Sequence, residues 1–478
     1  MSTVSSPEPL PNDPSLEQLR KQARELQREK RAEDPTFTLS AAQRDVARHY
    51  GFASWPRLVH HLEVVTRYSW RPDDEPDDEP DHDRLLRFAC LTYGDDDGPE
   101  RWQRARALLD ADPSLTRASA HTAAACADAA ALGEMLRADR SLALAQGGPF
   151  AWEPLMYLAY ARHVPEVSEP QVVASARALL DYGADPNVGY LWHGMPSPFT
   201  ALTGVFGEGE LGPKLQPRHP HSLALARVLL EAGADANDSQ TLYNRMFDDD
   251  DDHLVLLLEY GLGAGDGGPW RARLGDAIDA PATLLRKQLR WAVIHDQRAR
   301  VALLLAHDVD ANTTFADGRS AIDLAAMSGH REVVDALRAA GGADAVLDPI
   351  DAFIAAAFSH EPIEVPTEVL ARAKEARPGL VVWAASRGNR EAVTTLLALG
   401  FDIDAKARTD VPIEQEWETA LHAAVSHADR GMVELLLAAG ADPTIRDARF
   451  DAMPLGWARH AGNEELIELL APVTPSEL

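Results

Sequence analysis

The chain has 478 residues, of which 45% are hydrophobic and 25% are charged, and its formal net charge is −29. This composition is that of a folded protein and excludes a chain that is disordered throughout. The negative field disfavours general binding to nucleic acid or to anionic membranes, and it favours a partner with a basic surface.

The sequence has two cysteines, Cys90 and Cys126, and neither lies in a spacing typical of zinc ligands. We therefore expect no disulfide framework and no metal. Residues 1–14 are polar and rich in proline, without the apolar stretch of a secretion signal, and we expect them to be disordered. Because no apolar run approaches the roughly 18 residues that span a membrane, a cytoplasmic location is expected.

Residues 15–68 have the pattern of a small helical bundle, which we term the N-terminal module. We expect an amphipathic helix over residues 16–31, because apolar side chains recur there at helical spacing and Asp34-Pro35 follows. Two shorter helices are expected after it, separated by Gly51.

DNA binding is an alternative use of this module. Ala47, Gly51 and Ser54 have the spacing of a helix-turn-helix motif. Arginines form a stripe on the preceding helix, at Arg20, Arg24, Arg28 and Arg31. Glutamates interleave with that stripe and Pro56 lies at the start of the would-be recognition helix, so the pattern favours a solvated helix face.

Residues 69–82 are expected to be a linker, because they contain most of the acidic, proline-containing run DDEPDDEPDHD at 73–83. Like charges repel one another, and each proline disfavours helix at the residue before it. We expect this segment to be extended and solvated.

A short motif recurs along the rest of the chain. It consists of a Leu-Leu pair, two further residues, and then Gly-Ala-Asp or a close relative. Copies start at Leu179, Leu229, Leu304, Leu396 and Leu436. Each copy has the features of a helix end, since the leucines form a buried stripe and glycine adopts the left-handed conformation that caps the last carbonyl groups. Such internal repetition predicts a solenoid.

Before the last copy stands the segment Thr419-Ala420-Leu421-His422-Ala423-Ala424. It resembles the Thr-Pro-Leu-His-x-Ala opening of the ankyrin repeat, and the recurring motif resembles that repeat's close. The resemblance implies an all-α solenoid of helix-turn-helix repeats over residues 83–473. We count about eleven repeats, which begin near Asp83, His121, Ala151, Pro198, Ser239, Ala282, Gly318, Pro349, Gly379, Trp417 and Asp451. The phrase Tyr50-Gly51-Phe52-Ala53-Ser54-Trp55 in turn resembles a module that opens some bacterial ankyrin-repeat proteins.

Departures from the usual repeat length predict insertions in loops, because the stacked helices cannot accommodate extra residues. Insertions between the two helices of a repeat are expected at 162–171, 204–221 and 359–366. Insertions in the turns between repeats, which we term fingers, are expected at 189–198 and 406–416.

The motifs that could carry chemistry have structural explanations. Two stretches match G-x-G-x-x-G, at 207–212 and 263–268, but neither stands between a strand and a helix, as dinucleotide binding requires. The acidic run 248–252 precedes an apolar helix, where negative charge is favoured without any metal. The histidines are scattered, without a nucleophile and base arrangement, so we predict neither catalysis nor a cofactor.

The two fingers hold the candidate partner-binding residues. In the first finger these are Tyr190, Trp192, His193 and Phe199, because large aromatic rings in a polar turn are favoured interface anchors. The alternative is that Trp192 and Phe199 pack back on the adjoining repeat. In the second finger the candidates are Glu414 and Glu416, beside Trp417.

The sequence as a whole therefore predicts a non-catalytic scaffold or adaptor that binds a protein, which has a basic surface if the charge of −29 guides binding. Nucleic acid and membranes are disfavoured as partners. The DNA-binding regulator acting through the N-terminal module is kept as the alternative function.

Overall fold

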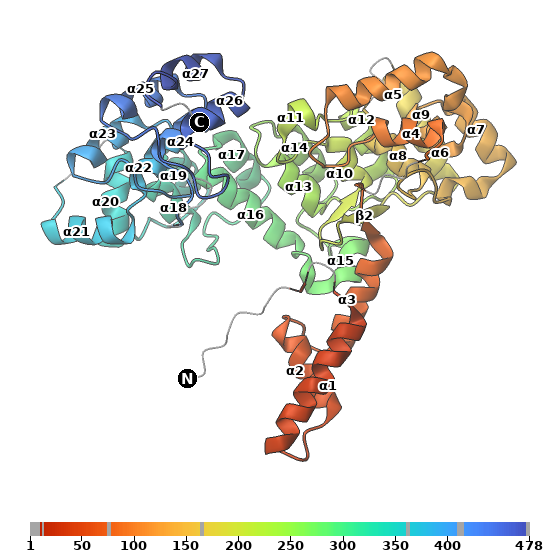
Figure 1. Cartoon of the computed structure of the whole chain (residues 1–478), viewed down its shortest axis with the longest axis horizontal. Coiled ribbons are helices and arrows are strands. Elements are labelled where there is room, and N and C mark those ends of the chain that lie inside the picture. Colours follow the sequence, from red (N-terminus) through yellow and green to blue (C-terminus); the bar gives the residue numbers. More distant parts are fainter. Residues whose placement is uncertain are drawn as a thin grey trace. The chain divides into compact units, whose positions relative to one another are not determined.

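We analysed a computed structural model of the chain, which describes residues 10–11, 14–73, 78–162, 167–359, 364–408 and 415–474. The chain forms two compact units, Met1–Leu285 and Arg286–Leu478, and each is described by itself. Helices make up most of both units (Figure 1).

The N-terminal module is a bundle of α1 (Leu16–Glu33), α2 (Leu39–His49) and α3 (Trp55–Tyr68). Its core is formed by apolar side chains from all three helices, namely Leu19, Ala23, Val46, Ala47, Leu58 and Leu62. The bundle agrees with the three expected helices, and α1 ends directly before Asp34. Figure 1 shows α1 and α2 side by side, with α3 leading from them toward α15 and β2.

Five of the predicted repeats lie in the first compact unit, each as a pair of helices. The pairs are α4 (Asp81–Ala89) with α5 (Pro99–Ala111), α6 (Ala120–Ala125) with α7 (Ala129–Ala138), α8 (Pro154–Tyr160) with α9 (Glu169–Asp181), α10 (Ala201–Phe206) with α12 (Ser222–Glu231), and α13 (Ser239–Arg245) with α14 (Asp252–Glu259). First helices pack on first helices and second helices on second helices, as α6 does on α8 and α7 on α9.

Short helices occupy the connections of this unit. They are α11 (Gly212–Leu215), α15 (Gly268–Leu274), and the 3-10 turns η1 (Pro113–Arg117), η2 (Arg140–Leu144) and η3 (Gly275–Ala277). The insertion expected at 204–221 therefore contains a helical turn, α11. The helix α15 packs against α3, so this connection contacts the N-terminal module.

The second compact unit contains the remaining repeats, although α16 begins in the first. The pairs are α16 (Pro281–Ile294) with α17 (Arg298–Ala306), α18 (Ala321–Met327) with α19 (Arg331–Ala339), α20 (Pro349–Phe358) with α21 (Thr367–Ala376), α22 (Leu380–Ser386) with α23 (Arg390–Ala398), α24 (Ala420–Ser426) with α25 (Arg430–Ala438), and α26 (Pro454–His460) with α27 (Glu464–Leu470). In the described residues the chain thus has eleven helix pairs, one for each predicted repeat.

Each repeat depends on its neighbour because its first helix is buried between those of the adjacent repeats. In α24, Thr419 caps the helix and its hydroxyl lies 2.8 Å from Nδ1 of His422. The other ring nitrogen of His422 is 3.0 Å from the carbonyl oxygen of Ala452, which lies just before the first helix of the next repeat, α26. Burial lowers the pKa of His422, so the ring is neutral and one of its nitrogens accepts a hydrogen bond.

The first finger forms a small sheet. Strand β2 (Gly189–Trp192) pairs antiparallel with β3 (Pro198–Thr200), and β1 (Ser69–Trp70) pairs parallel with β2, placing Trp70 opposite Trp192. A Cβ on Gly189 would lie 2.8 Å from the carbonyl oxygen of Phe199, so only glycine permits this close approach.

The segment expected to be a solvated linker contacts the repeats at both ends. Trp70 is buried against Trp152, with ring centroids 4.6 Å apart, and Glu79 forms an ion pair with the buried Arg87 at 2.8 Å. The helix α4 begins at Asp81, inside the acidic run. Residues 74–77 lie outside the described residues, and the domain boundaries at 68, 82 and 473 stay a prediction.

Replacement of His422 with alanine should loosen the last two repeats. The change removes two buried hydrogen bonds and leaves a cavity, so the opening free energy of α24 to α27 should fall by about 2 kcal/mol or more. Hydrogen exchange followed by mass spectrometry measures this local opening.

His427 provides the matched control, because it ends the same helix with an exposed side chain bonded to the carbonyl oxygen of Ala423. His427→Ala should leave exchange in the last two repeats nearly unchanged. Equal effects of both substitutions would contradict a special role for the buried histidine.

Candidate functional site

The first finger places two of its candidate aromatic side chains inside the fold. Tyr190 is 7% exposed and Phe199 is 4% exposed. The Tyr190 hydroxyl donates to Glu153 Oε2 at 2.5 Å, and its ring stacks on that of Trp152. The Phe199 ring contacts Tyr93 edge to face, with centroids 4.9 Å apart. Packing against the repeats, the alternative considered for Trp192 and Phe199, therefore describes Phe199, and Tyr190 is buried in the same way.

The tip of this finger remains partly accessible. Trp192 is half-buried, and its indole N–H donates to the carbonyl oxygen of Thr92 at 2.9 Å. The His193 side chain is 35% exposed, and its Nε2 lies 3.1 Å from Asp73 Oδ2. Met195, at the turn, is 45% exposed. The hairpin thus offers Trp192, His193 and Met195 to solvent.

The outer side of the finger contacts the N-terminal module of the same chain. An apolar cluster joins β2 to α3 and to the segment around α15, and consists of Val64, Leu191, Trp270, Leu274 and Ile278. Around it, Nε2 of His60 donates to the carbonyl oxygen of Arg273 at 3.0 Å, and Arg57 lies 3.5 Å from Asp276. These contacts involve α3, the helix that a helix-turn-helix motif would insert into DNA.

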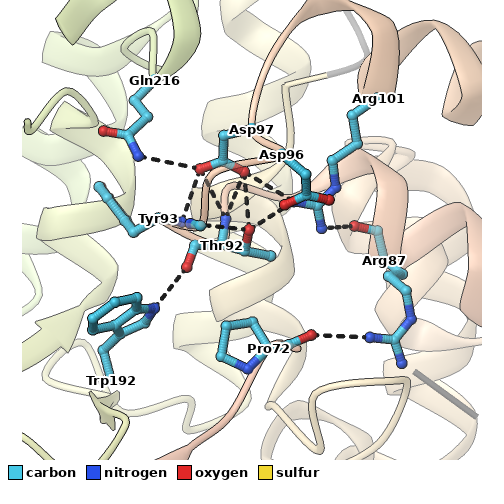
Figure 2. Close-up of polar contacts among 10 residues, drawn as sticks. Pro72, Arg87, Thr92, Tyr93, Asp96, Asp97, Arg101, Trp192 and Gln216 are labelled. Atoms are coloured by element: carbon cyan, nitrogen blue, oxygen red, sulfur yellow. Dashed lines mark hydrogen bonds and ion pairs between the residues drawn. The ribbon is translucent and has the colours of Figure 1, made fainter. Parts of the chain in front are cut away.

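A buried ion pair fixes the loop whose Thr92 carbonyl oxygen accepts the indole N–H of Trp192 (Figure 2). The Asp97 carboxylate accepts hydrogen bonds from the backbone N–H groups of Thr92 and Tyr93 and lies 2.9 Å from Arg101. Burial raises the pKa of Asp97, while Arg101 and the hydrogen bonds from Thr92 oppose that shift. Gln216, from the insertion after α11, donates to the same carboxylate at 3.5 Å.

The network continues from Arg101 to the segment before α4. Arg101 donates to the carbonyl oxygen of Arg87, and Arg87 donates to the carbonyl oxygen of Pro72 (Figure 2). Arg87 also donates to Glu79. The network therefore links the first repeat, the finger, the α11 insertion and the segment that leads to the N-terminal module.

The acidic segments considered for cation or phosphate binding belong to a second ion-pair cluster. Arg245 is completely buried and pairs with Glu208, inside the first glycine-rich stretch. Asp250 and Asp252, from the acidic run, both form ion pairs with Arg218, and the Asp250–Arg218 distance is 3.2 Å. Across the described residues no group of three or more His, Cys, Asp or Glu side chains is placed to hold a metal ion.

The second finger presents aromatic rings and arginines. Trp417 is half-buried, with the guanidinium carbons of Arg408 and Arg449 at 4.0 and 4.2 Å from its ring centroid. Glu416 is exposed, and Glu414 lies outside the described residues. The sequence pattern indicates Trp417 and its acidic neighbours but not the arginines that stack on the ring.

The loop of the last repeat displays Phe450, which is 64% exposed. The buried Asp447 shapes this loop, since its carboxylate accepts hydrogen bonds from the backbone N–H groups of Arg449, Phe450 and Ala452 and from the indole of Trp457. Burial alone would raise the pKa of Asp447, but these hydrogen bonds hold it below its ordinary value. Sequence reasoning missed Phe450, although Asp447 three residues before it is a turn signal.

Neither cysteine is exposed for chemistry. Cys90 and Cys126 are buried, and burial raises the pKa of the Cys126 thiol to about 12. In the part of the chain that the structure describes, we find no helix with the length and apolar character to cross a membrane.

The stacked helix pairs, the fingers between them and the Thr–His tie define a helical repeat protein. Residues 369–447 match a family model of ankyrin repeats in three copies, and residues 289–338 match a model of ankyrin repeats in many copies. An ankyrin repeat protein of Acanthamoeba polyphaga mimivirus is 31% identical over 118 residues, which is 24% of this chain and 15% of that protein. Residues 289–338 and 369–447 are therefore identified as ankyrin repeats, and ankyrin repeats are protein-interaction modules.

Replacement of Asp97 with alanine should strongly destabilise the first repeat. It leaves the buried Arg101 guanidinium without its carboxylate, which costs about 3–5 kcal/mol. Hydrogen exchange in α4 and α5 should increase sharply, and thermal unfolding of the full chain should begin at a lower temperature.

Asp96 is the matched control, because it also pairs with Arg101, at 3.2 Å, but its side chain is 67% exposed, against 0% for Asp97. Asp96→Ala should have little effect, since solvent already screens this pair. Equal unfolding temperatures of the two variants would contradict the role of the buried Asp97–Arg101 pair in holding the loop.

Proposed function

We propose that this chain is a non-catalytic scaffold or adaptor that binds a protein partner through the exposed fingers of its repeats. The observation that best supports this proposal is Phe450, an aromatic side chain that is 64% exposed on a loop held by Asp447. Exposing a large ring to water is unfavourable, and fixing it in advance lowers the ordering cost of binding. The adjacent stack of Arg449 on Trp417 extends this surface.

The candidate residues from the sequence divide into two groups under this proposal. Trp192, His193 and Glu416 are accessible enough to touch a partner. Tyr190 and Phe199 are buried and would act by holding the first finger in shape. The role of Glu414 stays a prediction.

The charge of the chain supports a basic partner surface, because a net charge of −29 attracts cationic groups at long range. Affinity for such a partner should fall as ionic strength rises. We further propose that the protein acts in the cytoplasm without a cofactor.

The alternative is a DNA-binding regulator that acts through the N-terminal module. Residues 15–68 contain ten lysine and arginine residues against seven acidic ones, and the arginines of α1 are exposed. Against DNA binding, α3 already packs against α15 and β2 of the same chain. These contacts favour the scaffold over the regulator.

The test begins with affinity capture from native lysate on the full chain, followed by titration of the purified protein partner. Phe450→Ala should weaken binding by about tenfold or more, because exposed aromatic anchors dominate interface energies. Val255→Ala is the control, since Val255 is also exposed, on the second helix of its repeat.

Equal affinity of the wild-type chain and the Phe450→Ala variant would contradict a partner surface at the loop of Phe450. Capture of nucleic acid that is lost on Arg24→Glu with Arg28→Glu would instead support the DNA-binding alternative. Those two arginines are exposed on α1, so their replacement leaves the bundle core intact.

A further inference from the structure

A cavity of about 200 Å³ lies where the N-terminal module meets the repeats of the first compact unit. Arg67 and Tyr68 at the end of α3 form one wall, and Trp270 and Arg273 of α15 form another. Tyr190 of β2 lines the cavity from the side of the finger. The walls are thus built by three segments that are far apart in the sequence.

Two arginines in this cavity are held in place by aromatic rings. The guanidinium carbons of Arg67 and Arg273 lie 5.3 and 5.2 Å from the centroid of the Tyr68 ring, and that of Arg273 lies 4.8 Å from the centroid of Trp270. Stacking orients a guanidinium group but does not use its five N–H donors, which lie in the plane of the group. The donors remain available to an anion.

The two acidic side chains that line the cavity accept hydrogen bonds from uncharged groups of the chain and form no ion pair with either arginine. Glu153 accepts the Tyr190 hydroxyl at 2.5 Å, and Asp185 accepts the backbone N–H of Asn187 at 2.8 Å. Among the described residues, no ion pair joins Arg67 or Arg273 to a carboxylate, whereas Arg101 and Arg245 are each paired with two or more. The cavity therefore brings together two cationic groups that have no anionic partner.

We propose that this cavity binds a small organic anion, whose carboxylate or phosphate group is held by Arg67 and Arg273 and whose body lies against Trp270. Planar guanidinium groups bind both kinds of anion through paired hydrogen bonds. The volume equals that of about seven water molecules, which limits the ligand to a small metabolite-sized molecule. A chain with a net charge of −29 has no general attraction for anions, so saturable binding would report on this local site.

Binding would also tie the N-terminal module to the repeats. Arg67 belongs to α3 of the module, whereas Arg273 belongs to α15, so one anion contacts both sides of the junction. A ligand that binds only the docked arrangement stabilises it, and the stabilisation grows with the ratio of ligand concentration to Kd. The anion would therefore act as an effector that holds α3 in place.

The test is isothermal titration of the full chain with inorganic phosphate and, separately, with succinate. Saturable binding of either compound is expected, and the compound that binds more tightly identifies phosphate or carboxylate as the recognised group. Arg67→Gln and Arg273→Gln should each weaken that binding by about tenfold or more, because each removes charge-assisted hydrogen bonds.

Arg24→Gln is the matched control, since Arg24 is exposed on α1 and does not line the cavity. Its affinity should equal that of the wild-type chain. Hydrogen exchange at the end of α3 should slow with ligand in the wild-type chain and in Arg24→Gln but not in Arg67→Gln. Absence of saturation with both compounds, or equal affinities of all variants, would overturn the proposal.

Discussion

The structure depends on one constraint: a helix pair of this size cannot bury its apolar face alone, so each repeat needs the next one. The buried first helices meet this need through small residues, as in α6, where every side chain is buried. Polar groups must then find partners across the same interface, and His422 does so by reaching the carbonyl oxygen of Ala452. Stacking therefore fixes both the hydrophobic contacts and the hydrogen bonds between repeats.

The same constraint explains why the first finger and the loop of Phe450 differ in exposure. The first finger belongs to repeats that also carry the N-terminal module, and its Tyr190 and Phe199 rings are covered by the chain itself. The centroid of the buried Trp70 ring lies 4.6 Å from that of Trp152, and β1 pairs with β2. The loop of the last repeat has no such cover among the described residues, and Phe450 is left exposed. The interaction surface that we propose follows from this difference.

The sequence predicted the repeats well, because leucine pairs and capping glycines are local signals of where helices end, as at Gly233 and Gly440. It did not predict that Trp70 is buried, because the acidic run beside it indicated a solvated linker and its partner Trp152 is far along the chain. The cavity was missed for the same reason, since Arg67 and Arg273 come together only through tertiary packing. Side-chain exposure at a finger tip likewise depends on what folds over it.

The central claim is that the first finger docks the N-terminal module onto the repeats. Hydrogen exchange in the full chain tests it directly by comparing the wild type with Trp70→Ala, which removes the largest side chain of β1. Our account predicts faster exchange in β2 and in the last turns of α3, with unchanged exchange in residues 286–478. Unchanged exchange in both β2 and α3 would contradict it.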